Sequence, residues 1–582
     1  MIATNLVLVH RPVVESFSVW VAVICLTWLG VTADRCAMAG DRPAGPPHKT
    51  RSAVIARHGM AATSQPLATA TAIRVLQQGG NAVDAAIAAN AVLGVVEPMS
   101  CGIGGDLFAI VWDAKTKKLY GLNASGRSPA SASLDFFKAK GLTVIPTFGP
   151  LSWSVPGCVD GWDQLRKRFG TKPWPELLAP AIEYAEAGFP VSEIIAAGWR
   201  ESERSLREIP TSADCYLPGG RAPGKGDVFR NPGLARSLRT IAKDGRDAFY
   251  RGPLAEAIVK YSQSVGGLFS LSDFAEHTSN FLDPVSTNYR GYDVWELPPN
   301  GQGIAVLQML NLLEPYDLKK LGAQSAEALH LMIEAKKLAY EDRAKYYADP
   351  DFARLPIAEL ISKPYAARRG RELKANRANP APVPGNPMQA DTIYMTVVDG
   401  DFNCVSLIQS NFHNFGSRHV PADLGFALQN RGTLFALDPN HLNRLEPRKR
   451  PFHTIIPGFV TKDGQPWLSF GLMGGDMQAQ GHAQVITDMI DFGMDVQEAG
   501  DAPRFCHEGS SEPTGQPAKG GGTVALESGI SSEIRRKLEA KGHHLLASPG
   551  SFGGYQAIRI DLKRGVLIGG SDPRKDGCAM GY

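Results

Sequence analysis

The dipeptide Asp391-Thr392 stands where the character of the chain changes abruptly. Residues 376–390 before it contain four prolines and no apolar periodicity, which predicts irregular structure. Residues 393–398 after it are mostly β-branched or aromatic, which predicts a buried strand. β-Propensity alone explains many threonines that begin a strand. Cleavage of the bond before Thr392, however, would place a free α-amino group beside its hydroxyl, and that pair forms an N-terminal nucleophile.

In this hypothesis Thr392 performs two acyl transfers. Its Oγ first attacks the carbonyl of Asp391 and forms an ester that water opens, with both groups held on one chain at high effective molarity. The released amine then acts as a general base while Oγ attacks the amide carbonyl of a substrate. The β-methyl group of threonine restricts χ1, which keeps Oγ aimed at the carbonyl. The dipeptide is therefore both a candidate cleavage site and a candidate nucleophile.

Two further pairs of residues bear on this chemistry. Gly474-Gly475 lies between a strand predicted at 467–470 and a predicted helix. Glycines let backbone N–H groups approach a reacting carbonyl, and a helix N-terminus adds positive potential, which favours an oxyanion hole over an ordinary turn. Ser410-Asn411 closes the next strand along the chain after Thr392, and taken alone it is a polar strand end.

Composition narrows the functional class. Of the 582 residues, 43% are apolar and 20% are charged, which permits a large buried core and excludes a disordered chain. The net charge of +3 is near neutral for this length, and no basic stripe with interleaved aromatics indicates nucleic-acid binding. The eight cysteines form no C-x-x-C pair, and Cys506-His507 and His543-His544 lack further ligands at metal-binding spacing. We therefore predict no metal site and no cofactor.

The first 39 residues have the layout of a secretory signal peptide. A mostly apolar run, 17–33, follows a basic residue, and Ala37-Met38-Ala39 fits a signal-peptidase site. A Pro- and Gly-rich linker is predicted at 40–52. We expect a periplasmic or secreted protein if this signal functions. The alternative is a cytoplasmic protein whose chain starts at Met38 or Met60.

Helical patterns dominate before residue 391, and strand patterns dominate after it. Predicted helices lie at 66–78, 82–96, 159–169, 176–187, 231–243, 253–263, 303–313, 325–347, 477–492 and 532–541. Predicted strands lie at 107–112, 119–123, 393–398, 404–408, 426–428, 455–460, 467–470, 556–560 and 566–568. The strands are apolar on both faces, as in sheets covered by helices. The helix at 325–347 is predicted to belong to an outer layer, with these charged residues largely on the side away from the core: Lys336, Lys337, Glu341 and Arg343.

Several longer motifs resemble one known family across nearly all of residues 53–582. They lie at 77–86 (QQGGNAVDAA), 97–106 (EPMSCGIGGD), 289–292 (YRGY), 471–475 (GLMGG), 502–505 (APRF) and 570–574 (GSDPR). In this order they resemble the γ-glutamyltransferase family of glutathione hydrolases and related acylases, which are N-terminal nucleophile hydrolases. The resemblance implies an α/β (α+β) fold, a four-layer αββα sandwich. It also implies self-cleavage into a large chain, 53–391, and a small chain, 392–582, that form one intertwined domain.

The resemblance assigns roles to the residues singled out above. Thr392 is the expected nucleophile, and Gly474 and Gly475 are the expected oxyanion hole. Ser410 stands where the family has a threonine hydroxyl that orients the nucleophile. The implied partners are a small-molecule substrate, an acceptor that is water, an amino acid or a peptide, and the two chains of one precursor, with a homo-oligomer left open.

The substrate-binding positions depart from the family pattern. The arginine that holds the substrate's α-carboxylate falls two residues later, at Arg127. The acidic residue for the α-amino group is replaced by Leu434, close to Arg431, and a pair of serines is replaced by His453-Thr454. We expect a pocket more cationic than is usual in the family. The residues expected to contact the substrate are Arg127, Asn411, Arg431, His453 and Thr454.

The sequence admits three functions. The leading one is hydrolysis or transfer of γ-glutamyl or similar carboxylate-bearing acyl groups, with glutathione as a typical substrate. An alternative is a des-amino acyl amide, such as a glutaryl-cephalosporin or an oxo-acid amide like oxamate. Leu434 favours des-amino groups, because an α-ammonium without an anionic partner costs on the order of several kcal/mol in a closed pocket. The third is an inactive homologue that serves as a binding protein, against which the retained Thr392 and glycine pair argue.

Overall fold

The computed structural model describes residues 49–381, 391–518, 520–547 and 550–582. The signal peptide expected at 1–39 and most of the linker expected at 40–52 lie outside the described residues, as do residues 382–390 of the proline-rich segment. The described residues belong to one unit, His48–Tyr582. Among them, no helix is long and apolar enough to cross a membrane, and the six cysteines are free thiols.

Two seven-stranded antiparallel sheets form the centre of this unit. The first has the strand order β1-β17-β16-β13-β12-β9-β8, and the second has the order β18-β2-β10-β11-β3-β4-β7. The strands of the first sheet are β1 (Val54–Ala56), β17 (Val566–Ser571), β16 (Gly554–Asp561), β13 (Gln465–Met473), β12 (Gly458–Lys462), β9 (Tyr292–Glu296) and β8 (Val285–Tyr289). Those of the second are β18 (Cys578–Gly581), β2 (Met60–Thr63), β10 (Asp391–Val398), β11 (Cys404–Phe412), β3 (Asp106–Asp113), β4 (Lys118–Ala124) and β7 (Asn280–Leu282).

Successive side chains of β10 enter different cores. Ile393, Met395 and Val397 pack with helices on the outer face of their sheet, whereas Tyr394 and Val398 pack against the opposite sheet. Because the side chains of a strand alternate between its two faces, an apolar strand of this kind is covered on both sides. The prediction that the strands after residue 391 are sandwiched between two layers is confirmed.

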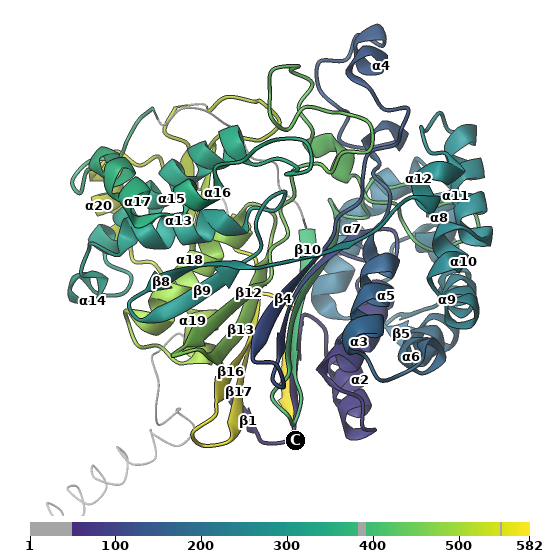
Figure 1. The fold of residues 1–582 in the computed structure, drawn as a ribbon, viewed down its shortest axis with the longest axis horizontal. Coiled ribbons are helices and arrows are strands. Elements are labelled where there is room, and N and C mark those ends of the chain that lie inside the picture. Colours follow the sequence, from purple (N-terminus) through teal and green to yellow (C-terminus); the bar gives the residue numbers. More distant parts are fainter. Residues whose placement is uncertain (1–48, 382–390, 519, 548–549) are drawn as a thin grey trace, which may run out of the picture. The chain divides into compact units, whose positions relative to one another are not determined.

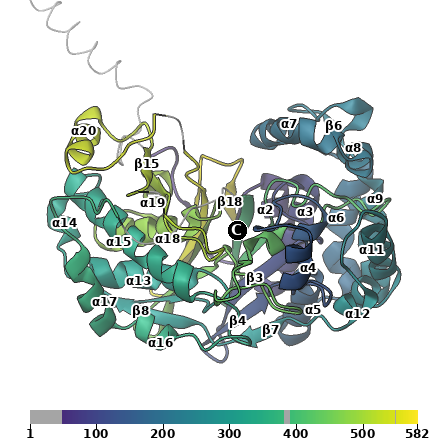
Figure 2. The same ribbon diagram turned by 90° about the horizontal axis from the view of Figure 1, so that it is seen from above.

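Helices cover the outer face of each sheet. The helices α2 (Pro66–Gln77), α3 (Ala82–Val96) and α5 (Cys158–Phe169) pack on the sheet that contains β10. The helices α13 (Gly303–Leu313), α15 (Ala326–Tyr346) and α18 (Met477–Ile490) lie on the side of the sheet that contains β13. Figures 1 and 2 show the two helical layers on opposite sides of the paired sheets. The expected four-layer αββα sandwich is confirmed.

Shorter elements complete the described chain. The remaining helices are α4 (Leu134–Ala139), α6 (Trp174–Ala187), α7 (Glu193–Arg207), α8 (Pro210–Tyr216), α9 (Pro232–Asp244), α10 (Arg246–Tyr250), α11 (Pro253–Ser264), α12 (Leu271–Ala275), α14 (Leu318–Leu321), α16 (Ile357–Leu360), α17 (Lys363–Arg369), α19 (Val496–Asp501) and α20 (Ser532–Ala540). Two small strand pairs are β5 (Phe189–Pro190) with β6 (Val228–Phe229), and β14 (Phe505–Glu508) with β15 (Thr523–Leu526).

The strand predicted at 426–428 is wrong. The segment is buried and apolar, but its backbone bonds to neighbouring loops instead of a strand. Leu428 N donates to His419 O at 2.9 Å, and Leu428 O accepts Ser417 N at 2.8 Å. An apolar run of three residues indicates burial and does not by itself select a strand.

The helix α15 also differs from its prediction. The charged residues expected on its outer side are at most 4% exposed; they are Lys336, Lys337, Glu341 and Arg343. These charges tolerate burial because they are paired or hydrogen-bonded: Lys337 pairs with Glu334 at 2.6 Å, and Arg343 pairs with Glu512 at 2.8 Å. The predicted outward charged face is therefore wrong.

Candidate active site

Thr392 lies in a β-bulge near the start of β10. The register of its pairing with β11 shifts between Asp391 and Ile393, so that Ser410 and Asn411 oppose the single residue Thr392. Thr392 itself is fully buried. Bulges re-aim side chains and are over-represented beside active sites. The chain thus departs from a regular ladder at the residue that the sequence predicts to be the nucleophile.

The Thr392 hydroxyl has a partner on each side. It donates to Ser410 Oγ at 3.2 Å, and the Gln478 side-chain amide donates to it at 3.4 Å. Ser410 Oγ also accepts the N–H of Phe412 at 2.8 Å, and Gln478 Oε1 accepts the N–H of Ile456 at 3.0 Å. Because both partners are held by backbone groups, they fix the direction of the Thr392 Oγ. The structure brings Ser410 to Thr392 and adds Gln478, which the sequence reasoning missed.

Gly474 and Gly475 form the turn from β13 to α18. Their φ angles are 115° and 55°, which residues with a Cβ rarely adopt. Among the described residues, neither glycine N–H donates to a protein acceptor. The two glycines lie just before the first turn of α18. At the N-terminus of a helix, unpaired amides and the helix dipole favour a negative charge. Gln478, in that first turn, contacts Thr392, so the turn offers two unpaired donors close to the candidate nucleophile.

A cavity of about 80 Å³ opens beside Phe412 at the end of β11. Other parts of its wall come from Ile145, from Thr454 and from the 3-10 turn η4 (Arg431–Leu434), which contributes Thr433 and Leu434. Phe412 pairs with Asp391 in the strand ladder. The cavity therefore lies next to the predicted cleavage bond.

Arg431 is a buried cation that contacts two residues of the cavity wall, Thr454 and Phe412. Its guanidinium donates to Thr454 Oγ1 at 2.8 Å and lies 4.3 Å from the centroid of the Phe412 ring. Its Nε and second terminal nitrogen are buried without a hydrogen-bond partner among the described residues. Burial lowers the pKa of Arg431 to about 9, against the opposing effect of Asp106, so the group stays charged at neutral pH. A buried cation with free donors favours an anionic ligand.

His453 does not add the second positive charge that was expected. Its Nδ1 accepts the N–H of Ile455 at 3.4 Å, so its Nε2 carries the proton and donates it to Asp106 Oδ2 at 3.0 Å. Burial, with Arg431 nearby, holds the pKa of His453 well below its ordinary value. Burial also raises the pKa of Asp106 to about 7. His453 is thus a neutral residue that orients Asp106.

Of the predicted substrate residues, Thr454 lines this cavity, whereas Arg127 and Asn411 neither line it nor contact its wall through the bonds described for Arg431. Arg127 pairs with Asp351 at 3.2 Å and with Asp349 at 3.6 Å, and it lines a separate cavity of about 350 Å³. Its charge is therefore already neutralised away from the candidate nucleophile. Asn411 is buried opposite Thr392, and its Oδ1 has no hydrogen-bond partner among the described residues.

An ion network behind the glycine turn was missed by the sequence reasoning. Arg343 donates to Asp476, the residue after Gly475, and to Glu512 at 2.8 Å. Although burial opposes its ionisation, Arg343 holds the pKa of Asp476 below its ordinary value. Burial raises the pKa of Glu512 well above its ordinary value. Both carboxyl groups line the cavity, but both are already bonded to Arg343.

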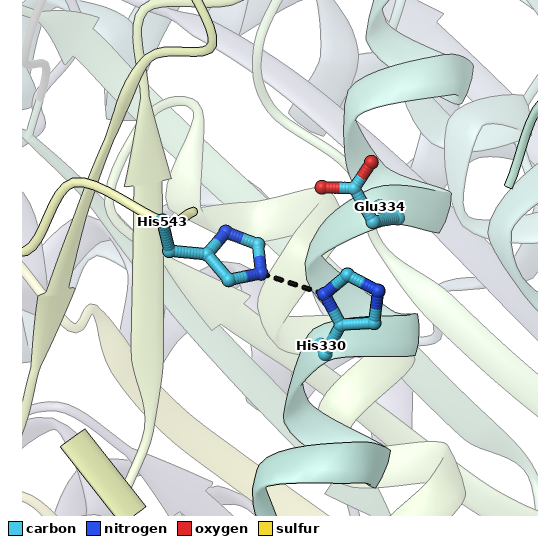
Figure 3. Close-up of side chains that lie close together, drawn as sticks. All are labelled: His330, Glu334 and His543. Carbon is cyan, nitrogen blue, oxygen red and sulfur yellow. Dashed lines mark hydrogen bonds between the residues drawn. The ribbon is translucent and has the colours of Figure 1, made fainter. Parts of the chain in front are cut away.

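Three side chains that can ligate metals meet elsewhere: His330, Glu334 and His543 place ligand atoms within 4.8 Å of one another (Figure 3). His330 Nε2 donates to a backbone carbonyl at 2.7 Å, so its Nδ1 accepts from His543 Nε2 at 2.8 Å. Glu334 accepts from Lys337 at 2.6 Å and from the N–H of Asn379 at 3.0 Å. The facing atoms are thus bonded within the protein and Lys337 neutralises Glu334, so we assign no metal here. Through the bonds to the backbone of Lys374 and Asn379, the cluster holds the chain that precedes the predicted cleavage site in place.

The sequence matches the profile of the gamma-glutamyltranspeptidase family over residues 68–582. The chain belongs to this family. It is 39% identical over 533 residues to the glutathione hydrolase-like YwrD proenzyme of Bacillus subtilis, covering 91% of this chain and 99% of that one. It is 34% identical over 539 residues to the oxamate amidohydrolase proenzyme of Klebsiella pneumoniae, covering 91% and 100%. The crystal structure of cephalosporin acylase from Bacillus halodurans is similar with a TM-score of 0.85 and 41% identity, covering 93% and 99%.

Family membership confirms several predictions. This gamma-glutamyltranspeptidase-family protein is an enzyme of the N-terminal nucleophile type, from a family of self-processing hydrolases and transferases. Its relatives are proenzymes, which indicates a large and a small chain from one precursor and small-molecule substrates. The names of the relatives differ in the acyl group, so membership does not select the substrate.

We expect the substitution Gln478→Leu to lower kcat about tenfold. The Gln478 amide donates to the oxygen that leaves as an alkoxide when an acyl-threonine is hydrolysed, and such a bond contributes roughly 1–1.5 kcal/mol. Gln480→Leu is the matched control, because Gln480 lies on the same helix, is buried, and bonds to His507 instead of Thr392. The measurement is kcat from steady-state kinetics of both processed variants. Equal losses of kcat would show that turnover does not use the Gln478 contact.

Proposed function

We propose that the chain cleaves itself between Asp391 and Thr392, and that Thr392 is the nucleophile of the processed enzyme. The hydroxyl held between Ser410 and Gln478 supports this role. The unpaired amides of the Gly474-Gly475 turn would receive the oxyanion. The new α-amino group of Thr392 would take the Oγ proton during attack and pass it to the leaving amine, while the acyl group is held as an ester. Water then releases the acyl group as an acid.

We propose further that the acyl group carries a carboxylate and lacks an α-amino group. The observation that carries this proposal is the buried guanidinium of Arg431, which bonds to Thr454 of the cavity wall and leaves two nitrogens without a partner among the described residues. Such a group binds carboxylates through short, charge-assisted hydrogen bonds. Leu434 lies one helical turn away on η4 and offers nothing to an ammonium group. Glutaryl amides and shorter oxo-acyl amides fit these requirements. The names of two relatives, a cephalosporin acylase and an oxamate amidohydrolase, likewise mention neither glutathione nor a γ-glutamyl group.

Hydrolysis of γ-glutamyl amides such as glutathione is the competing function. Asp476 and Glu512 line the cavity and favour it, because a carboxylate there would attract an α-ammonium group. Both are already bonded to Arg343, however, which lowers their attraction for a second cation.

The test compares kcat/KM for glutaryl-p-nitroanilide and γ-glutamyl-p-nitroanilide on the processed enzyme. We expect the glutaryl compound to react at least as well as the γ-glutamyl compound. Leu434→Asp should shift the ratio toward the γ-glutamyl compound about tenfold, since it supplies a partner for the ammonium group. Leu434→Asn, which is polar but uncharged, is the control and should shift it much less. A strong γ-glutamyl preference in the unmodified enzyme would contradict the des-amino proposal.

A further inference from the structure

Gln302 connects two parts of the site through one side-chain amide. It immediately precedes α13 and is fully buried. Its Nε2 donates to the carbonyl of Gly475 at 2.9 Å and to the carbonyl of Thr454 at 2.6 Å. Gly475 belongs to the proposed oxyanion turn, and Thr454 lines the cavity and accepts a hydrogen bond from Arg431. One amide thus ties the proposed oxyanion donors to the proposed acyl pocket.

The Gln302 amide is itself held in place by Arg343. Gln302 Oε1 accepts from a terminal nitrogen of Arg343 at 2.8 Å, which directs the two Nε2 hydrogens toward the carbonyls. The guanidinium lies 4.0 Å from the centroid of the Tyr340 ring and 5.3 Å from that of Phe452. It also bonds to Asp476, the residue that follows the glycine turn. A planar guanidinium with this many fixed partners is a rigid support.

We propose that Gln302, held by Arg343, is a positioning residue that sets the Gly474-Gly475 turn relative to the acyl pocket. The proposal rests on the proposed roles of this turn and of Arg431. Two consecutive glycines have more conformational freedom than any other dipeptide, so the turn requires support from outside itself. Oxyanion donors act only when they lie at the correct distance from the developing charge, which makes their support matter most in the transition state.

The first experiment separates kcat from KM in the processed enzyme, with the p-nitroanilide that the unmodified enzyme cleaves best. Gln302→Met should lower kcat between about tenfold and 100-fold and leave KM within about threefold, because misplacing the donors should cost less than the roughly 10²- to 10³-fold lost when one oxyanion donor is removed. Gln302→Glu keeps the shape and the contact with Arg343 but cannot donate to either carbonyl, so it should lower kcat in the same way. Arg343→Lys should show a smaller loss of the same kind.

The chain offers a matched control in Gln308, on the same helix α13. Gln308 is buried and also uses both ends of its amide, with Asp342 at 2.8 Å and Tyr347 at 2.6 Å. Gln308→Met should therefore resemble Gln302→Met in its effect on the melting temperature but leave kcat unchanged. Equal losses of kcat in the two variants, or a loss that lies mainly in KM, would overturn the positioning role.

The affinity for a transition-state analogue distinguishes a positioning role from a purely structural one, because only a positioning role predicts a selective loss of that affinity. In 4-boronobutanoic acid, boron replaces the carbonyl carbon of a glutaryl group: Thr392 Oγ bonds to boron, its proton passes to the α-amino group, and the tetrahedral boronate carries the negative charge. Gln302→Glu should weaken inhibition by the boronate by the factor lost in kcat, and leave competitive inhibition by glutarate unchanged. Equal weakening of both would overturn the proposal. If neither binds the unmodified enzyme, the substrate proposal fails, while the kcat comparison still tests Gln302.

Discussion

Thr392→Ala is expected to accumulate as one uncleaved chain without measurable amidase activity. Alanine lacks the Oγ that attacks the Asp391 carbonyl and, after cleavage, the substrate carbonyl. Removal of a catalytic nucleophile lowers kcat by roughly 10⁴- to 10⁶-fold. The unmodified protein should run on a denaturing gel as two chains, and N-terminal sequencing of the smaller chain should begin at Thr392.

Two variants control for the loss of a buried threonine as such. Thr396 lies on the same strand, is buried, and bonds through Oγ1 to Ser469 Oγ at 2.6 Å, so Thr396→Ala should still be cleaved. Thr392→Ser keeps the hydroxyl but loses the β-methyl that restricts χ1, and it should be cleaved more slowly than the unmodified chain. A small chain that begins at another residue, or cleavage of Thr392→Ala, would contradict the proposed mechanism.

The parts of the fold that the sequence predicted depend on local interactions. A helix was predicted at 82–96, and Asn81, which directly precedes it, forms a complete capping box with Asp84 at the N-terminus of α3. Apolar residues occupy both faces of the strand predicted after Thr392, which indicates a strand covered on both sides. β10 is such a strand. In both cases residues close in sequence determine the backbone, because the helix cap and the side-chain alternation of a strand are local properties.

Burial of charged residues could not be predicted in the same way. A helical pattern placed the charges of α15 on the outside, since charged groups are rarely buried without partners. Arg343 is buried because Asp476 and Glu512, more than a hundred residues later, supply those partners. Gln302 was missed for the same reason: its amide bonds to Gly475, which only the tertiary fold brings near. These residues support the site from behind and belong to no local motif.

The charge of a site residue also depends on its surroundings. His453 was expected to make the pocket more cationic, but burial keeps it neutral, and its Nε2–H donates a hydrogen bond to Asp106. Arg127 was expected to hold a carboxylate of the substrate, yet its partners are Asp349 and Asp351. Of the expected cations, Arg431 alone combines contacts with the cavity wall, at Thr454 and Phe412, with unpaired donors in the described part of the chain. The substrate proposal therefore depends on this one group.

Arg431→Met is expected to lower kcat/KM for glutaryl-p-nitroanilide about 100-fold, mostly through KM. Hydrogen bonds to a charged partner contribute roughly 1.5–3 kcal/mol, and the guanidinium has two free nitrogens for the acyl carboxylate. Methionine is apolar and of similar length, and it leaves no unpaired donor in the core. The melting temperature of the free enzyme should therefore stay the same or rise, as when other buried charges are replaced by apolar groups.

Butyryl-p-nitroanilide makes this test specific, because it has the glutaryl chain without its terminal carboxylate. Arg431→Met should change kcat/KM for the butyryl compound less than threefold, so that most of the loss depends on the carboxylate. Arg431→Lys keeps the charge but not the planar fork, and it should fall between the unmodified enzyme and the methionine variant. Equal losses with the glutaryl and butyryl compounds would mean that Arg431 supports the pocket through its stacking on Phe412 and its bond to Thr454. In that case the carboxylate would bind elsewhere, and the des-amino proposal would lose the observation on which it depends.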